Sequence, residues 1–146
     1  ILERHMGLPL MQKDLFFNVS GGLRISEPAV DLAAAAAIWS SLEEISLPGD
    51  WLFLGELALT GEVRRAPQVD VRIAEAKKLG VSTVVVPENT PNKVIAGACL
   101  RVQTISRVRD LATTLASAAA PVGSPLPSLQ SVRWVKAMPV CWPEPA

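Results

Sequence analysis

The chain has 146 residues, of which 49 % are hydrophobic and 19 % are charged, and this composition excludes a chain that is disordered throughout. Its length suits one domain with a substantial core. Lys+Arg and Asp+Glu both number 14, so no net charge draws the whole chain to nucleic acid, and any such contact must come from a local patch.

The first ten residues predict the end of a helix followed by a turn at Gly7, and His5 is expected at the surface. Residues 15–20, LFFNVS, and residues 23–25 alternate around two glycines and predict a β-hairpin. Ser26 is expected to cap a helix that runs through residues 31–44. Small side chains allow a helix to lie close against a sheet, so the five consecutive alanines of this helix predict that it is buried.

Residues 51–87 form the unit on which we expect the rest of the chain to pack. The apolar stretch 51–59 predicts a core strand, and Thr60-Gly61 predicts a tight turn into a returning strand. A helix is expected to begin near Pro67 and to end at Gly80, with a buried stripe of Val69, Ile73, Ala76 and Leu79. The β-branched run 82–86 predicts a buried strand.

After a polar loop over 88–93, residues 94–99 predict a short helical turn in which Cys99 is a small buried residue. Residues 100–105 alternate as a final strand does. Ser106 is expected to cap a last helix. The segment 117–146 is rich in proline and has no clean period, which predicts a tail without fixed structure.

The sequence lacks several well-known chemical motifs. It contains no GxxxxGK[ST] loop for ATP, no HExxH, no GxSxG and no pair of CxxC motifs. One histidine and two distant cysteines predict that this chain binds no zinc. The sequence shows no secretory signal and no apolar run long enough for a membrane, which predicts a cytoplasmic protein without membrane contact.

Four segments together resemble a known family. They read LER…GL.L, GGLRI.EPA.DLA, GE..LTGEVR and VVVP, and they occur in this order between Ile1 and Leu115. The chain thereby resembles the C-terminal Lon-protease-like domain of the RadA (Sms) family of bacterial DNA-repair proteins. The resemblance implies an α+β fold similar to domain 2 of ribosomal protein S5, with a mixed sheet on which helices pack, over residues 1–116. Because the chain begins with Ile rather than Met, we expect it to be a piece of a longer polypeptide.

The same segments resemble the proteolytic domain of Lon, and two positions differ from it. Val30 occupies the position of the catalytic serine, and Asp70 occupies the position of the catalytic lysine. An isopropyl group cannot attack a carbonyl, and a carboxylate cannot serve as the neutral amine of a Ser-Lys dyad. The resemblance therefore implies a peptidase fold without catalytic residues, and we expect this fragment not to be an enzyme.

For function, the resemblance implies a scaffold that assembles into a homo-oligomeric ring, a hexamer, and that contacts branched or single-stranded DNA during recombinational repair. It implies that ATP, Mg²⁺ and zinc belong to upstream regions of the parent protein, a DNA-dependent ATPase, and that this fragment needs no cofactor. Cations are the candidates for phosphate contacts. The predicted DNA-binding residues are Arg24, Arg64, Arg65, Arg72, Lys77 and Lys78.

Two alternatives stay open at this stage. One is an active Ser-Lys peptidase of the Lon type, in which other residues replace the lost pair. The other is a pure oligomerisation module that has no affinity for DNA.

Overall fold

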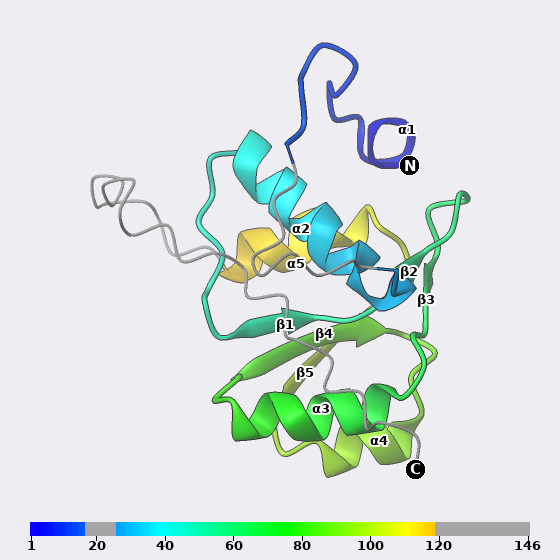
Figure 1. The fold of residues 1–146 in the computed structure, drawn as a ribbon, viewed down its shortest axis with the longest axis vertical. Coiled ribbons are helices and arrows are strands. Elements are labelled where there is room, and N and C mark those ends of the chain that lie inside the picture. The colour runs from blue at the N-terminus through cyan, green and yellow to red at the C-terminus, as the bar shows by residue number, and fades with distance from the viewer. Residues whose placement is uncertain (17–25, 119–146) are drawn as a thin grey trace.

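The structure is a computed structural model, and it describes residues 1–16 and 26–118. The predicted hairpin over 15–25 and the predicted tail over 117–146 lie almost wholly outside these residues. The elements follow one another along the chain as Figure 1 shows. They are α1 (Leu2–Met6), the 3₁₀ helix η1 (Pro28–Val30), α2 (Asp31–Leu42), β1 (Trp51–Phe53), β2 (Glu56–Leu57), β3 (Val63–Arg64), α3 (Val69–Lys78), β4 (Thr83–Pro87), α4 (Asn92–Gly97), β5 (Arg101–Ile105) and α5 (Asp110–Ala118).

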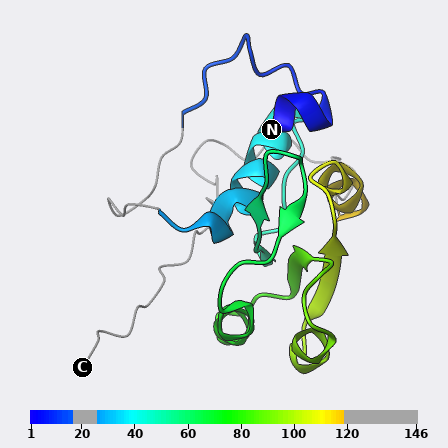
Figure 2. The same cartoon turned by 90° about the vertical axis from the view of Figure 1, so that its right-hand side faces the viewer.

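The main sheet has three parallel strands in the order β1-β4-β5, with Trp51 opposite Thr83 and Thr83 opposite Arg101. Parallel strands need a crossover connection, and α3 and α4 supply the two crossovers here. Figure 2 shows α3 and α4 end-on on one side of the sheet, with α2 and α5 on the other. The described part of the chain is therefore a sheet between two layers of helices.

Strand β4 carries the core on both of its faces. All five of its residues are buried, which confirms the strand predicted for this β-branched run. Val85 packs with α2 and α5, whereas Val84 and Val86 pack with α3 and α4. Because successive side chains of a strand point to opposite faces, a run of three valines fills both layers at once.

Helix α2 confirms the prediction of a buried alanine-rich helix, but its start differs from the prediction. Ala35, Ala36 and Trp39 are buried against the sheet. Ser26 does not cap the helix, which begins with a 3₁₀ turn at Pro28. The backbone N–H of Leu32 is satisfied instead by the carbonyl of Gly55, at 3.1 Å, so the neighbouring strand replaces a side-chain cap.

The predicted core strand over 51–59 is interrupted at Gly55. The N–H of Leu54 still donates to Val85 of the parallel sheet, at 3.0 Å. The N–H of Gly55 then donates to the carbonyl of Ala29, at 3.1 Å, which draws the chain out of the sheet. Residues 56–57 continue as β2 in a second sheet.

This second sheet is the hairpin β2–β3, whose antiparallel register pairs Glu56 with Arg64 and Leu57 with Val63. The predicted turn is confirmed, because Gly61 has φ 80° and its N–H donates to Ala58 at 2.9 Å. The described strands thus form two sheets rather than the single mixed sheet that we predicted, and an isolated bridge between Glu62 and Arg107 links the hairpin to the segment after β5.

His5 is half-buried, although the sequence predicted it at the surface. Its Nε2 donates to the carbonyl of Leu59 at 3.1 Å. The imidazole also lies against Gly61, where an added Cβ would come within 2.7 Å of the ring. The contact fixes α1 on the hairpin turn.

Two other residues differ from their predicted burial. Leu79 is 62 % exposed, because α3 ends at Lys78 and the chain turns at Gly80, whose φ is 79°. Val69, Ile73 and Ala76 are buried as predicted. Cys99 is exposed and has φ 51°, because it lies in the turn between α4 and β5 rather than in a helix.

We predict that Gly55→Ala destabilises the protein. The added Cβ would lie 2.8 Å from Cγ1 of Val63, which is only 3 % exposed and has little room to move. The expected loss is about 1–3 kcal/mol of the free energy of unfolding, measured by urea denaturation. Gly49→Ala is the matched control, because nothing lies within 4 Å of its added Cβ. Equal urea midpoints for the two variants would contradict the prediction.

Candidate nucleic-acid interface

The two positions that match the Lon dyad lie at the starts of two helices. Val30 is half-buried at the N-cap of α2, and Asp70 is exposed in the first turn of α3. An ion pair of 3.3 Å between Nη2 of Arg72 and Oε2 of Glu27 holds these two segments together. This ion pair links the two segments although α2 and α3 lie on opposite sides of the sheet, and the side chains at the two positions are an isopropyl group and a carboxylate.

The same ion pair gives Arg72 a structural position. Its Nε donates to the carbonyl of Pro67 at 3.1 Å, and its side chain is 17 % exposed. The guanidinium is therefore occupied on two sides within the protein.

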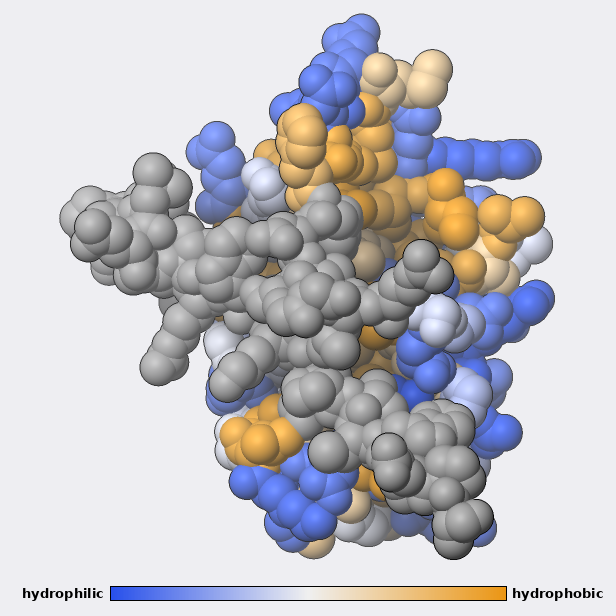
Figure 3. Space-filling view, viewed as in Figure 1, coloured by the Kyte–Doolittle hydropathy of each residue, from blue (hydrophilic) through white to orange (hydrophobic). Residues whose placement is uncertain are grey.

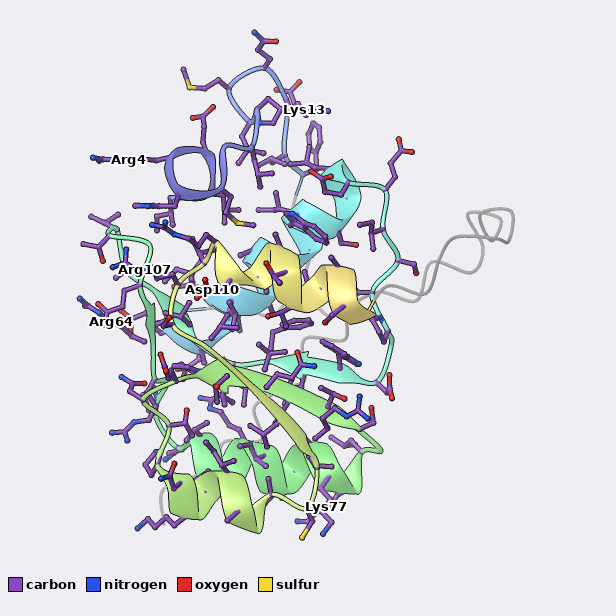
Figure 4. All side chains as sticks on the ribbon, turned by 180° about the vertical axis from the view of Figure 1, so that it is seen from behind. Arg4, Lys13, Arg64, Lys77, Arg107 and Asp110 are labelled. Carbon is purple, nitrogen blue, oxygen red and sulfur yellow. The ribbon has the colours of Figure 1, made fainter. Side chains whose placement is uncertain are left out.

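The two lysines of α3 are exposed in its last turn, where positive charge complements the helix dipole. Nζ of Lys78 lies 2.6 Å from Oε1 of Glu75. Figure 4 shows Lys77 well apart from Arg64. The predicted cations consequently do not form one patch.

The remaining predicted cations lie on or near the hairpin. Arg64 and Arg65 are both exposed, and Nε of Arg64 lies 3.4 Å from Oε2 of Glu62. Arg24 lies outside the described residues. Figure 4 shows a further arginine, Arg107, on the same side of the molecule as Arg64.

A shallow cleft of about 520 Å³ lies between the hairpin and the ends of two parallel strands. Residues 88–89 follow β4 and residues 106–107 follow β5, so the cleft is at the carboxyl edge of the sheet. In open α/β sheets this edge is where ligands bind. The lining residues are Thr60, Glu62, Val63, Glu88, Asn89, Ser106 and Arg107.

The cleft wall at Ser106 and Arg107 is held by Asp110, which corrects the predicted cap. Ser106 does not cap α5, because the helix begins only at Asp110. Oδ2 of Asp110 accepts hydrogen bonds from the N–H of Arg107 at 2.8 Å, and from the N–H and Oγ of Ser106 at 3.3 and 3.2 Å. The helix starts late because residues 106–108 extend along the hairpin, where Val63 N–H donates to Ser106 at 2.9 Å.

The sequence did not single out Arg107. It follows a predicted strand by two residues, and no local pattern distinguishes it from any other exposed cation. Its significance comes from the bridge to Glu62, which lies far away in the sequence. The one available signal was the basic pair Arg107 and Arg109 beside the predicted helix start.

A second, apolar groove of about 460 Å³ lies between α1 and α2. Figure 3 shows hydrophobic side chains gathered on this part of the surface. Its lining residues are Ile1, Leu2, Glu3, Leu10, Asp31, Ala34, Ala35, Ile38 and Leu57. Asp31 has a structural task there, because its Oδ2 accepts the N–H of Leu57 at 3.2 Å.

Within residues 1–16 and 26–118, no three or more His, Cys, Asp and Glu side chains gather as a metal site. None of the helices in the described ranges is both long and apolar enough to cross a membrane.

Residues 4–90 match the family model described as subunit ChlI of Mg-chelatase, and the chain belongs to this family. Curated relatives are named DNA repair protein RadA. The relative from Brucella abortus (strain 2308) is 39 % identical over 120 residues, which is 82 % of this chain and 26 % of the relative. The relative from Pseudomonas aeruginosa is 43 % identical over 109 residues, or 74 % of this chain and 24 % of the relative.

A relative from Streptococcus pyogenes serotype M3 (strain MGAS315) is 45 % identical over 89 residues, which is 61 % of this chain and 20 % of the relative. The resemblance to the RadA family is thereby confirmed. The chain spans about a quarter of the length of the relatives from Brucella and Pseudomonas, 26 % and 24 %.

The expectation that this segment is not an enzyme is wrong. The family is described as a subunit of Mg-chelatase, and the chain matches proteins named for DNA repair rather than an inactive peptidase. The reasoning failed because a missing Ser-Lys dyad excludes only one reaction. It does not decide whether a chain is part of a different enzyme.

We predicted that this segment needs no cofactor. The match to a family described as a Mg-chelatase subunit does not support that prediction. We tested whether the residues fit Mg²⁺ and ATP. The sequence has no GxxxxGK[ST] loop, and the described acidic residues do not gather in a set of three. We therefore assign no ligand for either group.

We predict that Arg72→Ala lowers the free energy of unfolding by about 1 kcal/mol, because it leaves Glu27 and the Pro67 carbonyl without their partner. Lys77→Ala, at an exposed position on the same helix, is expected to change the free energy of unfolding by less than about 0.5 kcal/mol. Thermal and urea unfolding of both variants provide the measurement. If the two lose equal stability, Arg72 does not clamp the two helix starts.

Proposed function

We propose that this chain is the DNA-contacting and self-assembling part of a RadA-like repair protein that acts on recombination intermediates. The observation that carries the proposal is the exposed pair Arg64 and Arg107, which the bridge between Glu62 and Arg107 brings to one side of the fold. The similarity to proteins named DNA repair protein RadA supports DNA as the partner.

We propose further that the fold is Lon-protease-like, similar to domain 2 of ribosomal protein S5. Two features support this proposal. Val30 and Asp70 lie at two helix starts that the ion pair between Glu27 and Arg72 joins, as expected for the remains of a shared site. The order of an alanine-rich helix, a strand, a hairpin and a second helix also fits the resemblance.

We propose assembly into a ring of six subunits, which would multiply each weak patch of positive charge around the pore. The apolar groove between α1 and α2 supports self-association, and it also favours the alternative of an oligomerisation module without DNA affinity. Sedimentation velocity at several concentrations measures assembly directly. A chain that stays monomeric at every concentration would contradict this part of the proposal.

We predict that the chain binds single-stranded and branched DNA in a strongly salt-dependent manner. Fluorescence anisotropy from about 50 to about 300 mM salt should give a linear fall of log affinity with log salt, with a slope of roughly −0.7 per neutralised phosphate for single strands. Arg64→Gln is expected to lower the affinity and to flatten this slope. Absence of binding at the lowest salt would favour the pure oligomerisation module.

We also propose that no Ser-Lys hydrolysis takes place at Val30 and Asp70, a statement that concerns this one reaction. The unmodified chain is expected to leave a denatured, fluorescently labelled protein intact over hours. The double variant Val30→Ser plus Asp70→Lys restores the two functional groups and is the matched comparison. Cleavage by the unmodified chain would establish the Lon-type peptidase alternative.

A further inference from the structure

The cleft beside the hairpin has an ordered set of charges on its rim. Glu62 and Arg107 are cross-strand partners in the bridge, so their side chains project from the same side of the paired backbones. Arg64 lies two residues beyond Glu62 and therefore projects from that same side. Glu62 consequently stands between two arginines.

The pairing of these charges is uneven. Glu62 is in contact with Arg64, at 3.4 Å, and both side chains are 54 % exposed. Within the described ranges, Arg107 forms no ion pair. Of the two arginines on this rim, Arg107 is therefore the one whose guanidinium can bind an external anion.

The backbone beneath Arg107 is fixed before any ligand arrives. Asp110 accepts its N–H at 2.8 Å, and the next residue, Val108, donates to Gly61 at 2.8 Å. Figure 4 shows Asp110 close to Arg107. A side chain that starts from a rigid position loses less conformational freedom when it binds.

The remaining lining residues supply hydrogen-bonding groups. Thr60 and Asn89 can each donate and accept, while Glu88 accepts. Groups of these types pair with the edges of nucleobases, and the cleft has a volume of about 520 Å³. A base that is paired and stacked in a duplex cannot enter such a cleft, whereas a base of a single strand can.

We propose that this cleft binds one nucleotide of a single DNA strand, with the adjoining phosphates against Arg107 and Arg64. This inference rests on the proposed function, because it assigns the DNA contact to particular residues. It places the contact at the carboxyl edge of the sheet and assigns no part of it to the lysines of α3. It also gives Glu62 a role, which is to weaken the site by neutralising Arg64.

The test compares four single variants of the 146-residue chain by anisotropy with a fluorescent single-stranded oligonucleotide of mixed sequence. Arg107→Gln is expected to weaken binding about tenfold and to reduce the magnitude of the salt slope by about 0.7, the value for one phosphate of a single strand. Glu62→Gln is expected to strengthen binding severalfold, because it releases Arg64. Damage to the fold cannot produce these opposite signs from two residues of one bridge.

Arg101→Gln is the matched control, because Arg101 begins β5 whereas Arg107 follows the other end of that strand. It removes the same charge from the whole chain and is expected to change the affinity less than twofold. Arg107→Lys keeps the charge and loses the bidentate geometry, so an intermediate affinity is expected. This variant also keeps the test decisive if Arg107→Gln does not fold.

Equal affinities of the Arg101 and Arg107 variants would overturn the inference and leave the proposed function standing. Tighter binding of a duplex than of the single strand would overturn the choice of a single strand. A loss of self-association in Arg107→Gln without a loss of DNA affinity would assign the cleft to a contact between copies of the chain. If the unmodified chain binds no DNA at low salt, the proposed function itself fails.

Discussion

Two backbone hydrogen bonds hold Gly55 against the start of α2, and the remaining architecture depends on them. Gly55 donates to Ala29 and accepts from Leu32, both at 3.1 Å. The approach is so close that a Cβ at this position would meet Val63. Because the chain leaves the parallel sheet here, the following residues form a hairpin that stands beside the sheet instead of extending it. The same contact satisfies the first turn of α2 without a polar side chain.

The position of the hairpin decides which charges meet. Its returning strand pairs with the segment after β5, which places Glu62 opposite Arg107 and leaves Arg64 on the same outward side. It also delays the start of α5 to Asp110, whose carboxylate then organises the corner. Arg72, in contrast, forms an ion pair with Glu27. Arg64 and Arg107 are thus exposed, whereas Arg72 forms an ion pair within the fold.

The chain belongs to the family described as subunit ChlI of Mg-chelatase and is similar to proteins named DNA repair protein RadA. The ion pair between Glu27 and Arg72 links the segments in which Val30 and Asp70 lie, and neither of these two side chains has the chemistry of a Ser-Lys dyad. The exposed arginines at the carboxyl edge of the sheet are a separate feature, and the function proposed here rests on them.

The sequence by itself determined the elements whose signals are local. The valines of β4, the alanines of α2, the turn at Gly61 and the buried stripe of α3 follow from side-chain periodicity and from the backbone freedom of glycine. Only the tertiary structure decided the break at Gly55, the cap by Asp110 and the meeting of Glu62 with Arg107. Each of these depends on a hydrogen bond or a pairing that other segments of the fold set up. The local sequence of an apolar strand does not indicate whether the strand continues or ends. The sequence around an arginine does not indicate which distant residue it will meet in the folded chain.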